Sequence, residues 1–515
     1  MSRINSNVSS LIARTNLANS SKDLSTRLER LSTGLRINRG ADDPAGLIIS
    51  NRLGSEINGL NQAVKNSERA SSVISTTEGA LSEVSDLLNS IRGLVVEAAN
   101  TGAISDDERA ANQLQINSAI ESITRISNAT SFGGLKLLNG SLDYVLSGVN
   151  SNNIANAKVF GANLSNRTSV AVNVQTIASA QTGRLFVRGD YAGPFGNGAF
   201  QSSVNLEITG PKGVQTIQFL SGTTFANVIT AINSRKDSTG VSASLNNGNA
   251  NSGLVFSSTG FGSSEFVSVK QLDRVGGGGF FQTYSLAGNA PVTATIDIPA
   301  LITATTLVSS QQDSGRDVFA IVNGALGTGK GTKISLSDAT NISLELDLTT
   351  TFATTNGSSS TFNITGGGAL YQLGGEINSA QQINIGLPSI AASRLGGTIV
   401  GGKLNFLDSI RTGGKNDLST GNFQTATDVL LKAIDETSLL RGRLGALEKN
   451  TLNTNVRSVQ AAIENLTASQ STIRDADFAV ETAALSRAQV LQSAGTSVLQ
   501  LANSQSQNVL QLLRT

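Results

Sequence analysis

The sequence predicts a multidomain α + β protein: a long-helix coiled-coil or bundle core formed by both termini, with a β-rich inserted region in the middle. Apolar residues recur every three or four positions from residue 1 to about 140, and again from about 425 to 515. Between these zones Gly, Ser, Thr and Asn dominate, and short stretches alternate apolar with polar residues, as half-buried strands do. At 515 residues the chain exceeds one compact core, so we expect two to four units.

Composition excludes several classes of function. The chain has 38 Lys+Arg, 37 Asp+Glu and no Cys, His or Trp. Without Cys or His, a zinc site, a thiol nucleophile and a Ser-His-Asp triad are all excluded. The balanced charge lacks the basic stripe that a nucleic-acid or membrane-surface protein needs. We therefore predict a structural protein that is not an enzyme, with no metal or cofactor and with neither nucleic acid nor membrane as a partner.

The N-terminus carries no recognisable targeting signal. Its first residues, MSRINSNVSS, are polar and lack the apolar run of a secretory signal. No window of the sequence is long and apolar enough to span a bilayer. Taken alone, these features predict a soluble cytoplasmic protein.

The first helical zone contains a break near residue 40. Before it, an apolar seam with alternating spacings of four and three is predicted at Ile4, Val8, Leu11, Leu24, Leu28, Leu31 and Leu35. The break spans residues 40–44, where Asp43 is suited to cap a helix and Pro44 to occupy its first turn.

A very long helix should follow this break. Its apolar residues keep one heptad register from Leu53 to Val95, and a helix from Pro44 to Asn100 would be roughly 85 Å long. Bundles and coiled coils use such rods. Ser105 and Glu108 then form a capping-box pattern that opens another helix.

The last zone mirrors the first, with one seam before a break at residues 474–477 and another after it. The second seam is predicted at Ala484, Ala488, Leu491, Gly495, Val498, Ala502, Val509 and Leu512. Val490, Leu499 and Leu501 lie off this seam, so the terminal helix is apolar on more than one side. Such a helix is buried either inside one domain or by neighbouring subunits. We favour neighbouring subunits because these helices lie at both extreme ends.

The middle zone predicts one or two β-rich domains. Residues 204–208 and 342–346 alternate like strands, and residues 225–233 fit a short helix. One segment, Gly324–Lys330, matches the start of a phosphate-binding loop. Gly331 stands where Ser or Thr is needed, and a strand-like stretch follows where a helix is required, so we predict a Gly-rich hairpin.

Both ends resemble bacterial flagellin. The N-terminal signature is carried by Leu31–Asn38 (LSTGLRIN) and Asp42–Leu47 (DDPAGL). The C-terminal one is carried by Arg474–Phe478 (RDADF), Arg487–Val498 (RAQVLQSAGTSV) and Gln507–Arg514 (QNVLQLLR). The match covers roughly the first 140 and last 145 residues. No comparable signature is identified in the middle.

The resemblance implies a three-layer organisation. Residues 1–42 and 474–515 would be inner-tube terminal helices, and residues 43–142 and 370–473 an outer-tube helical rod domain with a β element. Residues 143–369 would be a variable, surface-exposed insert. The seam residues from Ile4 to Leu35 and from Ala484 to Leu512, except Gly495, would form the polymerisation core.

The resemblance also implies a function, partners and a location. The chain would be the structural subunit of the bacterial flagellar filament, a helical homopolymer used for swimming. It would be exported without a cleavable signal peptide and be extracellular. Its other partners would be the flagellar export apparatus, an export chaperone, and the filament cap and junction proteins. A hook–filament junction protein of the same architecture is the alternative.

A host Toll-like receptor is a further partner that the resemblance implies. The matching surface would contain Leu88, Ser90, Arg92, Gly93, Leu94 and Gln115. Arg92 and Leu94 fit the strongly detected pattern, whereas Ser90 replaces a typical Arg, and Gly93 and Gln115 replace Glu. We therefore expect weakened detection. The alternative, that these residues serve only inter-subunit packing, stays open.

Overall fold

The computed structural model describes residues 7–512 apart from 163, 165–167, 188–197, 201, 249, 251–252, 275–281, 287–306, 338–341 and 401–402. The chain divides into two compact units. The first unit comprises Met1–Ile74, Tyr371–Gln382 and Gly445–Thr515, and the second comprises Ser75–Leu370 and Ile383–Leu444. Helices dominate both ends of the chain and strands dominate its middle, which confirms the predicted α + β organisation.

The helices have the bounds α1 Val8–Thr33, α2 Pro44–Ala98, α3 Asp106–Ala129, α4 Phe225–Asn233, α5 Lys236–Thr239, α7 Thr350–Ala353, α8 Phe423–Leu447, α9 Asn453–Arg474 and α10 Phe478–Leu512. Two of the helices, α2 and α3, begin where local sequence signals predict. Asp43 Oδ1 accepts a hydrogen bond from Gly46 N at 2.9 Å at the start of α2. Ser105 and Glu108 form the predicted capping box of α3. A π-helical turn, Glu448–Leu452, joins α8 to α9.

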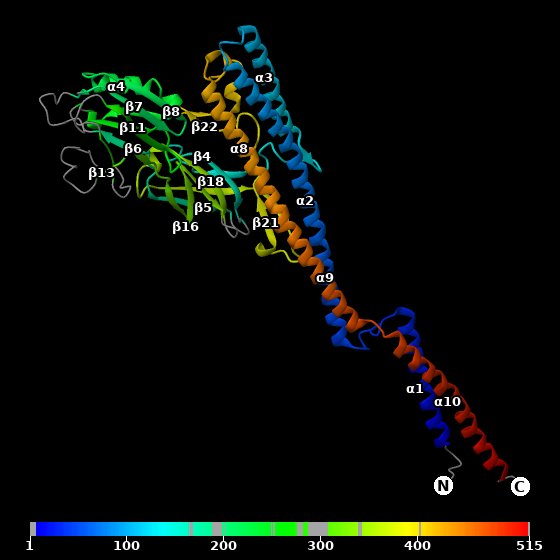
Figure 1. Ribbon diagram of the computed structural model, residues 1–515. Helices are drawn as coiled ribbons and strands as arrows, with labels where there is room; N and C mark the ends of the chain where they lie inside the picture. The colour runs from blue at the N-terminus through cyan, green and yellow to red at the C-terminus, as the bar shows by residue number, and fades with distance from the viewer. Residues whose placement is uncertain are drawn as a thin grey trace. The chain divides into compact units, whose positions relative to one another are not determined.

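In the first unit α1 and α10 lie side by side (Figure 1). The chain segments that follow α1 and precede α10 also meet, since Leu35 and Asp475 form an antiparallel bridge. The residue 371–382 turn packs on α2 where two glycines face each other. A Cβ added to Gly59 would stand 3.1 Å from the Gly375 carbonyl oxygen, so this close contact favours glycine.

The strands form antiparallel sheets in every described pairing. Their bounds are β1 Ser131–Phe132, β2 Leu135–Lys136, β3 Tyr144–Ser147, β4 Ile154–Ala162, β5 Val170–Ala178, β6 Arg184–Val187, β7 Val204–Gly210, β8 Gly213–Phe219, β9 Val241–Leu245, β10 Leu254–Ser258, β11 Phe266–Arg274, β12 Thr283–Leu286, β13 Leu307–Ser309, β14 Gln312–Ser314, β15 Phe319–Val322, β16 Ala325–Lys330, β17 Lys333–Ser337, β18 Ile342–Leu348, β19 Ser359–Gly367, β20 Ala369–Gln372, β21 Gln382–Ile385, β22 Thr398–Val400 and β23 Lys403–Asn405.

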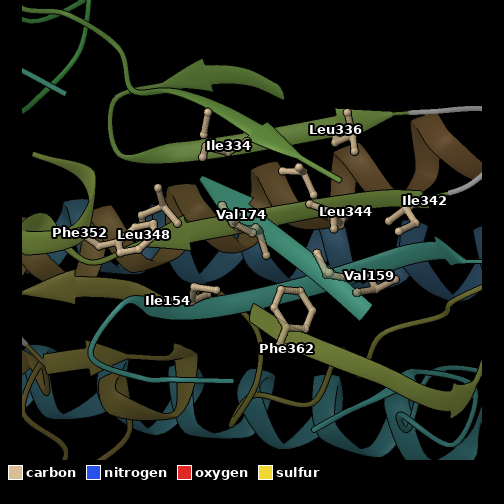
Figure 2. Close-up of a cluster of buried hydrophobic side chains, with 14 of the residues drawn as sticks. Ile154, Val159, Val174, Ile334, Leu336, Ile342, Leu344, Leu348, Phe352 and Phe362 are labelled. Atoms are coloured by element: carbon tan, nitrogen blue, oxygen red, sulfur yellow. The ribbon is translucent and has the colours of Figure 1, made fainter. Parts of the chain in front are cut away.

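The largest sheet of the second unit has eight strands in the order β3-β19-β5-β15-β16-β17-β18-β4. Alternate residues of these strands point to one side and build a hydrophobic core (Figure 2). Ile154 from β4, Val174 from β5 and Leu344 from β18 meet there. The segment Gly324–Lys330, which matches the start of a phosphate-binding loop, comprises β16 and the residue before it. It lies within the β15–β16–β17 meander of this sheet, so the predicted Gly-rich hairpin is confirmed.

A second hydrophobic core lies elsewhere in the inserted residues. Two smaller sheets, β13-β12-β6-β10-β9 and β14-β11-β7-β8, contribute to it together with α4. Val228 and Ile232 of α4 are fully buried there. The inserted residues therefore hold two cores, and their division into one or two domains stays a prediction.

The compact units group residues differently from the three predicted layers. The second unit holds the insert together with residues 75–142 and 383–444, which were assigned to the rod. The boundaries between the units fall inside α2, β20, β21 and α8. The three-layer division therefore stays a prediction about the assembled state.

Candidate assembly site: the paired terminal helices

The faces through which α1 and α10 contact each other are built from small residues. Ala13 of α1 and Ala488 and Ala502 of α10 are buried. Gly495 lies against Leu17, and an added Cβ would stand 3.3 Å from the leucine Cδ1. Ala488, Gly495 and Ala502 are spaced by seven residues, so they recur on one side of the helix.

Polar side chains fix the antiparallel pairing at intervals along its length. Asn7 Nδ2 donates to the Ala502 carbonyl oxygen at 2.8 Å, and Ser10 Oγ donates to Asn503 Oδ1 at 2.7 Å. Further along, Gln492 Nε2 donates to Ser21 Oγ at 3.2 Å. All of these contacts belong to one register of α1 against α10.

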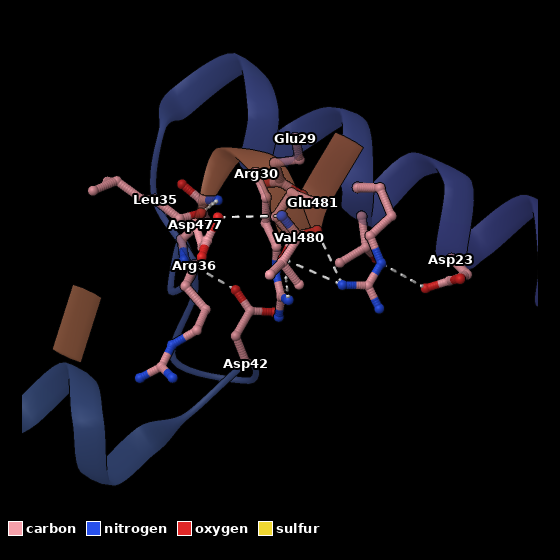
Figure 3. Close-up of polar contacts among 12 residues, drawn as sticks. Asp23, Glu29, Arg30, Leu35, Arg36, Asp42, Asp477, Val480 and Glu481 are labelled. Atoms are coloured by element: carbon pink, nitrogen blue, oxygen red, sulfur yellow. Dashed lines mark hydrogen bonds and ion pairs between the residues drawn. The ribbon is translucent and has the colours of Figure 1, made fainter. Parts of the chain in front are cut away.

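The strongest polar contact of the pair centres on Glu481 (Figure 3). Its side chain is 7% exposed, and its two oxygens lie 3.0 Å from Arg27 Nη1 and 3.1 Å from Arg30 Nη1. Burial raises the pKa of Glu481, but the hydrogen bonds and charges of the two arginines outweigh burial and hold its pKa below the ordinary value. Glu481 is therefore an ionised carboxylate within the helix pair.

The two breaks of the sequence are held together beside this ion pair. Arg36 N donates to the Arg474 carbonyl oxygen at 2.7 Å, and Ala476 N donates to the Gly34 carbonyl oxygen at 2.9 Å. Asp42 Oδ2 accepts from the backbone N–H groups of Asn38 and Arg39, which lowers the pKa of this carboxyl.

Asp477 starts α10 by capping it. Its Oδ1 accepts from Ala479 N at 2.9 Å and from Val480 N at 3.2 Å. Both breaks are therefore ordered turns that end one helix and start the next.

Many apolar side chains of the pair point away from the α1–α10 contact. Leu11 and Leu501 are each 67% exposed and Val490 is 68% exposed. The other exposed members of this set are Val8, Ile12, Leu28, Phe478, Val480, Leu491 and Val498. We call these ten residues the outer apolar set. Exposed apolar side chains in this number are typical of surfaces that contact other proteins.

Some of the predicted seam residues lie in the α1–α10 contact, and others belong to the outer apolar set. Ala488 and Ala502 are buried, and Leu24, Leu31, Leu35 and Ala484 are half-buried. Val8, Leu11, Leu28, Leu491 and Val498 are exposed. Ile4 and the side chains of Val509 and Leu512 lie outside the described residues.

Not every residue of the predicted α10 seam faces α1 within the same chain. Ala488, Gly495 and Ala502 belong both to the predicted seam and to the contact with α1. Among the residues between them, Gln492 and Leu499 are half-buried, whereas the seam residues Leu491 and Val498 are exposed. The contact with α1 accepts a glutamine that bonds to Ser21, and Leu491 and Val498 stay exposed beside it, so their place in a polymerisation core stays a prediction.

Sequence reasoning also missed Arg27, Arg30 and Glu481. Glu481 lies seven residues before Ala488, at the same heptad position as the small residues, and that spacing was a signal available in the sequence.

The predicted receptor surface is corrected at one residue. Leu88 is fully buried, because its heptad register places it with the core residues Leu81 and Val95. Ser90, Arg92, Gly93 and Gln115 are exposed and Leu94 is half-buried.

A sequence whose two ends pair as helices with exposed apolar side chains, and whose middle is β-rich, defines a self-assembling structural subunit. Residues 4–143 match the bacterial flagellin N-terminal helical region, and residues 427–513 match the bacterial flagellin C-terminal helical region. Flagellin of Salmonella typhimurium is 30% identical over 99% of both chains, and B-type flagellin of Pseudomonas aeruginosa is 32% identical over 99% of both. The chain belongs to the bacterial flagellins and is a subunit of the flagellar filament.

A further match lies in the insert, where residues 205–260 fit the flagellin hook IN motif. This match corrects the expectation that the middle of the chain carries no signature. The motif spans β7 to β10 with α4 and contributes much of the second core. The flagellar cap protein FliD of Escherichia coli, in a structure of its D1-D2-D3 domains, is 14% identical, with 73% of this chain and 74% of that chain covered. Its TM-score of 0.25 is too low to support a structural conclusion.

Family membership makes the chain a structural protein, and the related flagellins form an extracellular filament. Within the described part of the chain, no helix is both long and apolar enough to cross a membrane.

Proposed function

We propose that α1 and α10 form the inner layer of the filament by burying the outer apolar set against the terminal helices of neighbouring copies. The observation that carries this proposal is the exposure of these side chains on helices that are already paired with each other. Burying an exposed Leu or Val side chain stabilises by about 1.5–3 kcal/mol. A set of ten such residues on each copy supplies a large driving force for assembly, which offsets the entropy of ordering the chain ends.

The other predicted layers complete this proposal. Residues 43–142 and 370–473 would surround the inner layer as an outer tube, with helices packed in coiled-coil fashion. Residues 143–369 would be displayed on the outside. Support comes from the length of α2, which runs from Pro44 to Ala98, and from the two self-contained cores of the insert.

Elongation of preformed filament seeds tests the proposal. The Leu11→Gln/Leu501→Gln variant should lose most elongation, because two side chains of the outer apolar set become polar. Leu220→Gln is a matched control, since Leu220 lies in the insert and is 65% exposed. It should elongate like the parent. Normal elongation by the double variant would contradict the assignment of the inner layer.

The junction-protein alternative makes a different prediction in the same assay. A junction protein would add to seeds as a short ring and then stop, whereas a filament subunit continues to add. Electron microscopy of seeds incubated with excess chain distinguishes the two outcomes.

Family membership supports the remaining partners. These are the export apparatus and an export chaperone, which would deliver the chain without a cleavable signal, and the cap and junction proteins at the two filament ends. Deleting the export apparatus of a producing strain should leave the full-length chain inside the cell. Appearance of the chain in the medium of that strain would contradict this route.

We also propose weak detection by a host Toll-like receptor. Ser90, Gly93 and Gln115 lack the side chains of the strongly detected pattern and are exposed. The Ser90→Arg/Gly93→Glu/Gln115→Glu variant should raise the response of a receptor-reporter cell line. An equal response to parent and variant would leave only a packing role for this surface.

A further inference from the structure

We propose that Glu481, held by Arg27 and Arg30, is the positioning residue that selects the register of α1 against α10 within one chain. This inference goes beyond assembly, because it concerns how the two ends of a single chain choose one alignment among several.

The small residues of the contact do not define a register by themselves. Ala488, Gly495 and Ala502 recur every seven residues, so a slip of seven residues places one small residue where another was. Ala13 and Leu17 would then meet other small residues of α10; an alanine in place of Gly495 would bring its Cβ to 3.3 Å from Leu17 Cδ1, the end of a flexible side chain that can shift. Packing alone therefore leaves at least three alignments with similar contacts.

The neutral polar contacts add little discrimination. Ser10, Ser21 and Asn503 are short side chains on a partly open surface, where water replaces a lost partner at small cost. The carboxylate of Glu481 differs from them because it is buried and charged. An unpaired charge in that place costs far more than an unpaired hydroxyl.

Each one-heptad slip removes the partners of Glu481. A slip in one direction brings Glu481 level with Asp23, a like charge. A slip in the other direction brings Arg30 level with Ala488, so the guanidinium enters the small-residue contact without a carboxylate. Only the observed register gives Glu481 both arginines.

Cysteine cross-linking reads the register directly, because the chain contains no native cysteine. Ser10→Cys/Asn503→Cys reports the observed register, in which these two side chains contact each other. Ser10→Cys/Thr496→Cys reports a slip of one heptad. Oxidised full-length chain should give mostly the first cross-link, and adding Glu481→Gln should lower the ratio of first to second by about tenfold, the order expected for losing a charge-assisted hydrogen bond.

Glu29→Gln is the matched control. Glu29 pairs with Arg39 of the same chain segment, at 2.9 Å, so its loss should leave the ratio unchanged. An unchanged ratio in Glu481→Gln would overturn the proposal. If Glu481→Gln gave neither cross-link, the charge-reversed Arg27→Glu/Arg30→Glu/Glu481→Arg variant decides: recovery of the first cross-link supports the proposal, and failure to recover it overturns it. Cross-linking is independent of seed elongation, so a chain that keeps its register but does not elongate contradicts only the assembly proposal.

Discussion

Lys158 Nζ and Glu436 Oε1 form an ion pair of 2.7 Å that joins strand β4 to helix α8 within the second unit. Lys158 stands directly opposite Glu345 of the neighbouring strand β18. Lys432, one turn before Glu436 on α8, lies 3.7 Å from Glu345. The sheet face turned away from the hydrophobic core therefore contacts α8 through charges.

Removing Lys158 should loosen this contact. Lys158→Met removes the 2.7 Å partner of Glu436, whose side chain is 11% exposed, and leaving a buried polar group without its partner costs about 1–3 kcal/mol. Lys158→Met/Glu436→Gln should recover most of that loss, because neither charge then remains. Native-state hydrogen exchange of the β4 and α8 amides measures the loss of stability in the single variant and its recovery in the double variant. Equal destabilisation by the single and the double variant would mean that the charges do not interact.

The side chain of Gln113 should hold the segment that precedes α8. Its Nε2 donates to the Ile410 carbonyl oxygen at 2.9 Å, and its Oε1 accepts from Leu418 N at 3.0 Å. Gln113→Leu leaves two buried backbone groups unpaired, at about 1–3 kcal/mol each. The Leu418 amide should therefore lose its protection from hydrogen exchange. Gln115→Leu changes an exposed glutamine on the same helix and should leave that amide protected.

The capping box of α3 predicts a smaller, local effect. Ser105 Oγ accepts from Glu108 N at 3.2 Å, and Glu108 Oε2 accepts from Ser105 N at 2.8 Å. Ser105→Ala should cost about 1 kcal/mol, visible as a lower urea midpoint by circular dichroism. Ser118→Ala, an exposed position in the middle of α3, should be neutral or slightly stabilising. Similar losses in both variants would argue against capping as the cause.

Local signals in the sequence were sufficient for most of the helical architecture. Asp43 with Pro44 and Ser105 with Glu108 fixed two helix starts, because capping depends only on neighbouring residues. Residues 225–233 were predicted as a helix, and α4 has those bounds. The order of the eight-stranded sheet was not predictable, since β3 pairs with β19 and β5 pairs with β15, far away in the sequence.

The candidate site was predictable only in part, for a physical reason. Apolar periodicity locates faces that avoid water, and it found both terminal helices. It does not separate a face buried inside the chain from one left for other copies, so Leu491 and Ala488 were assigned to one seam. The pairing face itself is small and polar, with Gln492 and Glu481 inside it, and such residues carry no hydrophobic signal.

Acid should weaken the pairing of α1 with α10 through Glu481. Because the pKa of Glu481 is lowered in the folded pair, its ionised form stabilises the pair, and this contribution is complete above the pKa of an unfolded glutamate, about 4.3. The contribution is lost as pH falls from there through the folded pKa, when Arg27 and Arg30 face a neutral acid. Glu481→Gln should therefore pair less stably than the parent at pH 7 and equally at low pH. Thermal melting of filaments across this pH range measures the difference, and a gap of constant size at every pH would assign it to packing instead.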